Sequence, residues 1–170
     1  MADFDITKDP DLSAPAVEKP ERSVLDALRN ELKRVVRNEP LTLHVPARNG
    51  MSIKYDTNIE SGTLQQWRKA SYSKSMPDNF DGLKFASIVI ANQATEITFE
   101  GEVIIDDSGD LLNFRNPRFI EMLGAVKAVE AVRKLYGIDG HIFTAADEIL
   151  RASGYDSEGQ DQKEDPTLLT

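Results

Sequence analysis

The chain of 170 residues contains no cysteine, only two histidines and one tryptophan, and no long uninterrupted run of apolar residues. Without cysteine, a disulfide framework, a thiolate metal site and a cysteine nucleophile are excluded. Without a run of about 18 apolar residues, no membrane-spanning helix is expected. The net charge of −9 lacks the cationic excess that non-specific nucleic-acid binding needs. The acidic start, Met1–Asp5, lacks the basic and apolar parts of a signal peptide, so we expect a cytoplasmic protein.

The sequence also lacks the motifs that commonly carry catalysis or nucleotide binding. Its glycines build neither GxGxxG nor GxxxxGKS/T, and GxSxG is absent. His44 and His141 lie on separate predicted elements without a metal-ligand spacing, so we assign both a structural role. The aspartate-rich segment 106–110 is similar to a calcium loop, but Leu111 and Pro117 occupy the positions that need Gly and Glu, which indicates a solvated turn. We therefore predict a protein that is not an enzyme and has no cofactor or metal.

Charge and proline divide the chain into three parts. Residues 1–22 contain three basic and six acidic side chains and three prolines, and residues 156–170 contain one basic and five acidic side chains. Both segments are poor in apolar residues, which is typical of disordered arms. The middle, residues 23–155, is long enough for one domain with one hydrophobic core. We therefore predict a globular domain at 23–155 between two disordered acidic arms.

Hydrophobic periodicity in the first half of this domain predicts two helices and a hairpin. Apolar residues recur at helical spacing after Ser23, a suitable N-cap, and this helix is predicted to end before Pro40. Strand-like segments at 41–45 and 51–56 flank an Asn-Gly pair, which favours a β-hairpin. A short helix follows, and we predict that its Trp67 is a core anchor where the hairpin meets the first helix.

The second half adds a buried helix, a second hairpin and two amphipathic helices. Asp81 is predicted to cap a helix that is apolar on nearly all sides, which implies burial on several faces. Strand-like runs at 96–99 and 103–105 form the second hairpin, and a turn leads to a further strand-like run at 111–114. A helix is predicted from Asn116 to Gly137, with an internal glycine that can interrupt it, and a last helix is predicted from Thr144. These elements predict an α+β fold: a single, mainly helical domain with two β-hairpins.

The two halves of the domain differ in charge. Residues 23–74 have nine basic and five acidic side chains, whereas residues 75–155 have seven basic and thirteen acidic side chains. The basic excess includes the polar face of the first predicted helix, formed by Arg29, Lys33, Arg34 and Arg37. This pattern is compatible with an acidic partner or with head-to-tail self-association. Ordinary surface charge is the alternative.

Three stretches of the domain resemble a family of small proteins from long-tailed phages of actinobacteria, the tail assembly chaperones. The first is LTLHVPARNGMSIKYD at 41–56, followed by LQQWRKA at 64–70. The second is FDGLKFASIVIANQ at 80–93. The third is DLLNFRNP at 110–117, with AVRKLYGIDG and a final ASGY before residue 156. The resemblance covers residues 41–155 and consists of fold patterns, not catalytic motifs.

The resemblance implies a non-enzymatic assembly factor in the cytoplasm of the phage's host. Such proteins are thought to coat the long tape measure protein, to recruit tail tube subunits and to leave before the tail is finished. A longer form made by ribosomal frameshifting, which the family often has, would begin near the acidic segment 156–170. A holdase for a helical client needs exposed apolar contacts, and the candidates near the loop 71–80 are Tyr72, Met76 and Phe80. Membership of the core is the alternative for Phe80. The alternative function is a structural virion component, a tail or head–tail protein retained in the particle.

Overall fold

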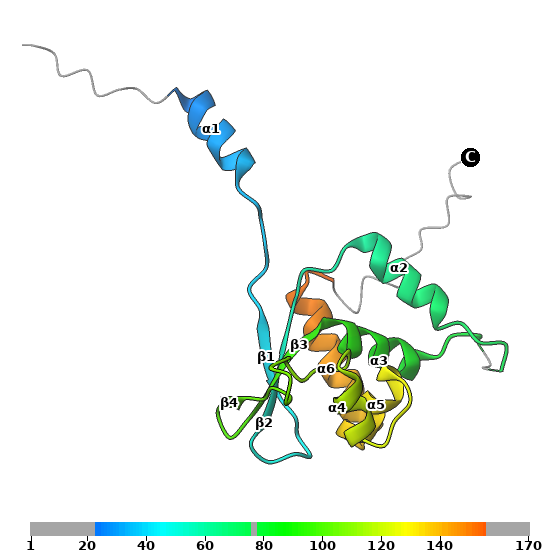
Figure 1. The fold of residues 1–170 in the computed structure, drawn as a ribbon. Coiled ribbons are helices and arrows are strands. Elements are labelled where there is room, and N and C mark those ends of the chain that lie inside the picture. Colours follow the sequence, from blue (N-terminus) through cyan, green and yellow to red (C-terminus); the bar gives the residue numbers. More distant parts are fainter. Residues whose placement is uncertain (1–22, 76–77, 156–170) are drawn as a thin grey trace, which may run out of the picture. The chain divides into compact units, whose positions relative to one another are not determined.

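The computed structural model describes residues 23–75 and 78–155, which form six helices and a four-stranded antiparallel sheet (Figure 1). The predicted α+β fold is confirmed. The chain divides into two units, one up to Val36 and one from Arg37, so the domain expected at 23–155 is split between them. Helix α1 (Val24–Lys33) belongs to the first unit, and every other element belongs to the second, which we call the compact unit. The two predicted acidic arms lie outside the described residues.

Helix α1 begins where the sequence predicted and ends earlier. The Ser23 hydroxyl accepts a hydrogen bond from the Leu25 amide at 3.2 Å, which is the expected N-cap interaction. The helix ends at Lys33 because Arg34 adopts an extended backbone, so Val35 and Val36 lie beyond it. None of the ten helical residues is buried.

The sheet has the order β1 (Leu41–His44), β2 (Met51–Tyr55), β3 (Ala94–Phe99) and β4 (Glu102–Val103). The two predicted hairpins, β1–β2 and β3–β4, are both present, and pairing of β2 with β3 joins them into one sheet. In the first turn, Gly50 has a φ of +74°, which a residue with a side chain rarely adopts. Cross-strand pairing places four residues, one from each strand, side by side in one row across the sheet: His44, Ser52, Thr98 and Val103.

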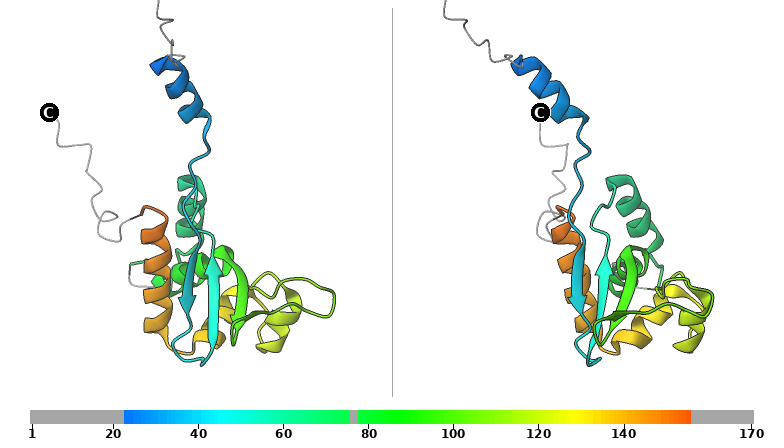
Figure 2. Two further views of the ribbon diagram at one scale, coloured as in Figure 1. Left: turned by 90° about the vertical axis from the view of Figure 1, so that its left-hand side faces the viewer. Right: turned by 60° about the vertical axis from the view of Figure 1, so that its left-hand side comes forward.

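Five helices complete the compact unit: α2 (Ser61–Ala70), α3 (Gly82–Gln93), α4 (Pro117–Met122), α5 (Ala128–Tyr136) and α6 (Asp139–Ala152). Helices α3, α5 and α6 lie on one face of the sheet (Figure 1). Figure 2 (left) looks onto the opposite face. Thr42 and His44 of β1 are exposed and alternate with Leu43, which pairs with the buried Ile53, so they belong to this open face. The core lies between the sheet and the helices, and α3 is buried along most of its length, as its all-round apolar sequence predicted.

The second half contains the interruption expected at the internal glycine, and it differs from the sequence prediction at the start of its last helix and at one strand. The helix expected from Asn116 to Gly137 is broken into α4 and α5 by a turn in which Gly124 has a φ of +65°. Gly137, at φ +72°, ends α5 as expected. Helix α6 starts at Asp139 and not at Thr144, whose hydroxyl donates to a carbonyl one turn earlier within the helix. The strand expected at 111–114 is reduced to one bridge between Ile105 and Leu111.

Two local predictions in the compact unit concern the N-terminal cap of α3 and the burial of Trp67. The Asp81 carboxylate accepts from the Lys84 amide at 2.9 Å, so the expected cap of α3 is confirmed. Trp67 packs against the core from α2 but is only half-buried, so it is a peripheral contact and not a central anchor. The deepest link between the sheet and the helices is a pair of buried hydroxyls, Tyr55 of β2 and Tyr136 of α5, at 2.8 Å.

Candidate functional site: an aromatic cluster beside the α2–α3 connection

The four basic residues proposed as partner contacts are distributed over both units. Arg29, Lys33 and Arg34 are exposed on or directly after α1, and Arg37 is the first residue of the compact unit. Arg29 pairs with Asp26 at 3.3 Å, and Arg34 pairs with Glu31 at 3.6 Å. Exposed pairs of this kind contribute little stability, so the cations stay accessible to a partner.

The three apolar candidates lie at the connection between α2 and α3. Tyr72 and Phe80 form an isolated antiparallel bridge at the base of this connection, and Met76 lies outside the described residues. The bridge is held on both sides, because the Ser73 amide donates to the Asn79 carbonyl and the Asp81 amide donates to the Ser71 carbonyl at 2.8 Å. The short sequence between the helices therefore presents Tyr72 and Phe80 side by side.

The rings of Tyr72 and Phe80 belong to a larger aromatic cluster. The ring centroids of Tyr72 and Phe80 are 5.3 Å apart, and those of Phe80 and Phe85 are 5.8 Å apart, both in tilted arrangements favourable for aromatic pairs. Phe143 of α6 lies near them, because its ring and that of Phe80 both approach Gly82: a Cβ atom built on this glycine would lie 3.5 Å from the Phe143 ring and 4.0 Å from the Phe80 ring. We call Tyr72, Phe80, Phe85 and Phe143 the aromatic cluster.

The cluster is anchored in the core at one end and exposed at the other. Phe85 is buried and Phe80 is half-buried, whereas Tyr72 is 60% exposed and Phe143 is 46% exposed. The Arg68 guanidinium lies 5.9 Å from the centroid of the Phe85 ring, in cation–π range. Aromatic residues and arginine are enriched at the centre of protein interfaces. The cluster can therefore bind apolar side chains of another protein.

Sequence reasoning did not find Phe143. The predicted last helix started at Thr144, so Phe143 was left outside it, although α6 includes both residues. The signal was present in the sequence: with helical spacing extended back to Ile142, Phe143 falls beside the buried stripe and not on it. An aromatic residue at such a position is a candidate for contact with something other than the core.

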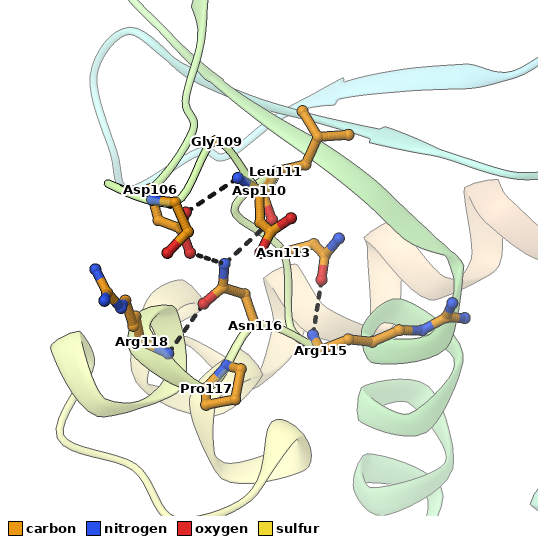
Figure 3. A pocket seen from close by; sticks show the side chains of 10 residues that line it. Asp106, Gly109, Asp110, Leu111, Asn113, Arg115, Asn116, Pro117 and Arg118 are labelled. Carbon is orange, nitrogen blue, oxygen red and sulfur yellow. Dashed lines mark hydrogen bonds between the residues drawn. The ribbon is translucent and has the colours of Figure 1, made fainter.

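A second site, the pocket around the aspartate-rich turn, has its central polar side chains, Asp106 and Asn116, hydrogen-bonded within the fold (Figure 3). One Asp106 oxygen accepts from the amides of Ser108 and Asp110, and the other accepts from the Asn116 side-chain amide at 3.0 Å. These hydrogen bonds, the one from Asn116 first, lower the pKa of Asp106 below its ordinary value. Asn116 also caps α4 through the Arg118 amide at 3.0 Å. The segment is the turn that the sequence predicted, and it orients α4.

The two histidines, far apart in the sequence, line one small cavity between β1 and α6. The cavity is also lined by Tyr136 and Glu148. The buried Nδ1 atom of His141 has no hydrogen-bond partner. Over residues 23–75 and 78–155, no three His, Cys, Asp or Glu side chains are grouped so that they could hold a metal ion.

Comparison with known proteins adds no evidence about function. We compared the chain with protein-family models, with curated proteins and with solved structures, and none of the three comparisons gave a significant match. In the part of the chain that the structure describes, none of the helices is both long and apolar enough to cross a membrane.

Proposed function

We propose that this protein is a non-enzymatic tail assembly chaperone that binds the tape measure protein of a long-tailed phage and helps to recruit tail tube subunits in the host cytoplasm. The observation that carries the proposal is the aromatic cluster, which offers exposed Tyr72 and Phe143 on a base that is fixed in the core. The sequence resemblance over residues 41–155 supplies the identity of the client.

The chemistry of the cluster suits a long helical client. An extended amphipathic helix presents apolar side chains at every third or fourth position, and a chaperone holds it by covering part of that stripe. Full burial of one large apolar side chain contributes about 1.5–3 kcal/mol. Tyr72 and Phe143 are each about half exposed, so each can contribute roughly half of that on binding. Contacts of this size give reversible binding, which a chaperone that leaves the finished tail requires.

Co-purification tests the proposal directly. The protein is co-expressed with the tape measure protein of the same phage, and the soluble complex is quantified at low salt and at about 1 M salt, where the Debye length falls to about 3 Å. We expect the complex to survive high salt, because apolar contacts are not screened. Tyr72→Ser and Phe143→Ser together should lower the recovery of the complex at least tenfold. Val126→Ser, which removes an exposed apolar side chain elsewhere on the compact unit, should leave it unchanged.

Two results would move the assignment to the alternative, a structural virion component. One is failure of the tape measure protein to co-purify at either salt concentration. The other is stoichiometric presence of this protein in purified virions, measured by mass spectrometry. A chaperone is absent from finished particles or present only in traces.

A further inference from the structure

Helix α1 has an apolar stripe that the described residues of its own unit, 23–36, leave uncovered. Val24, Leu25, Leu28 and Leu32 recur at helical spacing, and each of these side chains is more than half exposed. An isolated helix shorter than about 12–15 residues is only marginally stable in water, because nucleation is costly. Helix α1 has ten residues. A stripe of this kind on so short a helix therefore points to a surface that covers it.

A matching apolar patch lies on the outer side of the β3–β4 arm, which we define as residues 99–111. Val103, Ile105 and Leu111 are all exposed there, whereas their sequence neighbours Ile104 and Leu112 pack toward the core. Side chains alternate between the faces of a strand, so Val103 and Ile105 share the outer face. Leu111 joins them through its bridge with Ile105. We call these three residues the arm patch.

The charges around the two surfaces are opposite. The arm 99–111 contains five carboxylates, Glu100, Glu102, Asp106, Asp107 and Asp110, and no lysine or arginine. Arg29 and Lys33, four residues apart, flank the α1 stripe on one side, and Arg34 and Arg37 follow the helix. Only Asp107 of the arm is paired with a cation, Arg118 at 3.0 Å, among the described residues. A basic apolar helix and an acidic apolar patch are complementary in both respects.

The short connection after α1 limits how much of the helix can reach the patch of its own molecule, whereas the patch of another molecule is open to the whole stripe. The Asn38 amide donates to Asn58 at 2.8 Å and the Asn38 side chain donates to Thr57 at 3.0 Å, so Asn38 is held in line with the register of β1 and β2. From Asn38 to Lys33 an extended chain spans at most about 17 Å. His44 is six residues after Asn38, and Val103 lies three strands across from His44 in the same row of the sheet, so Val103 is about 24 Å from Asn38. Lys33 therefore cannot come closer than about 7 Å to Val103 of its own molecule, and only the earlier turns of α1 could cover that patch.

From these observations we propose that copies of this protein associate head to tail, with α1 of one copy docked on the arm patch of the next. The contact is heterologous, so each copy has one helix to donate and one patch to accept. One short helix covers a small interface, which places the association in the weak, concentration-dependent class. This inference does not depend on the proposed chaperone function.

Sedimentation velocity of the full chain over a concentration series up to about 1 mM tests the proposal. We expect the average mass to rise with concentration, and to rise less at high salt. Leu28→Asp with Leu32→Asp disables the donor, and Ile105→Asp disables the acceptor. Each variant should weaken self-association at least tenfold, because it removes apolar burial and also places a carboxylate in an apolar contact, where a charge is costly to bury. Ile138→Asp is the matched control: Ile138 is exposed to a similar degree, 52% against 57% for Ile105, and it stands at the N-cap of α6, where Asp is favoured.

Mixing the variants separates the proposal from the other arrangements. The donor-defective chain still has its patch and the acceptor-defective chain still has its helix, so their mixture should form a one-to-one dimer that neither forms alone. A wild-type chain that stays monomeric up to about 1 mM would overturn the proposal. A second result would also overturn it: Leu28→Asp with Leu32→Asp abolishes association, whereas Ile105→Asp, shown to be folded by circular dichroism, still associates. That result would mean that the α1 helices of two copies pair with each other.

Discussion

The hydroxyl pair of Tyr55 and Tyr136 gives the sharpest test of how the compact unit is held together. Both side chains are essentially inaccessible to solvent, and their hydroxyl oxygens lie 2.8 Å apart. Tyr136→Phe removes one partner and leaves the Tyr55 hydroxyl buried without a hydrogen bond, which costs about 1–3 kcal/mol of unfolding free energy. We expect Tyr55→Phe to cost a similar amount for the same reason.

The double variant distinguishes a true pair from two independent hydroxyls. With both hydroxyl groups replaced by hydrogen, no buried polar group is left without a hydrogen bond, so the double change can leave the unfolding free energy nearly unchanged. The measurement is urea unfolding at neutral pH, followed by circular dichroism, for the wild type, both single variants and the double variant. We expect the double variant to cost less than the sum of the singles by at least about 1 kcal/mol. Additive costs would refute the pairing, because they would mean that each hydroxyl is satisfied on its own.

The same pair predicts a loss of stability at alkaline pH. Burial raises the pKa of Tyr55 well above its ordinary value, and burial raises the pKa of Tyr136 as well. A group whose pKa is higher in the folded state than in the unfolded state stabilises the fold fully below the unfolded pKa, which is about 10 for tyrosine. This contribution is lost as pH rises from about 10 toward the folded pKa. The double Phe variant should lose less stability than the wild type between about pH 10 and 11, and identical slopes would contradict the reasoning.

Two further predictions concern the turn before α4 and the face of α2. Asn116→Ala removes both the cap of α4 and the side-chain amide that donates to Asp106. It should lower the unfolding free energy by about 1 kcal/mol, and it should raise the pKa of Asp106 toward its ordinary value in an NMR titration. An unchanged pKa would show that the backbone amides alone lower it. Trp67→Ala removes a half-buried contact with the core and should lower the unfolding free energy by about 1–3 kcal/mol, below the 3–5 kcal/mol of a fully buried tryptophan, and a larger loss in thermal unfolding would place Trp67 deeper than the structure does.

Local signals in the sequence determined much of the secondary structure. Ser23, Asp81 and Asn116 were identified as caps because their side chains satisfy amides within two or three residues, and such short-range bonds form in the same way in any fold. Asn49-Gly50 marked the first hairpin for the same local reason, since glycine adopts positive φ without strain. The all-round apolar sequence of α3 predicted a buried helix because no polar face was left for solvent.

Only the tertiary structure decided what each apolar face contacts. The apolar stripe of α1 has the same spacing as that of a helix that packs on a core, yet none of its residues is buried. Burial depends on a second surface, which the periodicity of the helix does not specify. Tyr72, Phe80 and Phe143 form one cluster only because α2, α3 and α6 pack so that residues more than sixty positions apart meet at Gly82. The sequence by itself therefore determined the elements and their ends, where local hydrogen bonds and backbone sterics suffice. The candidate contact surfaces required the fold, because they are made of side chains that the packing left outside the core.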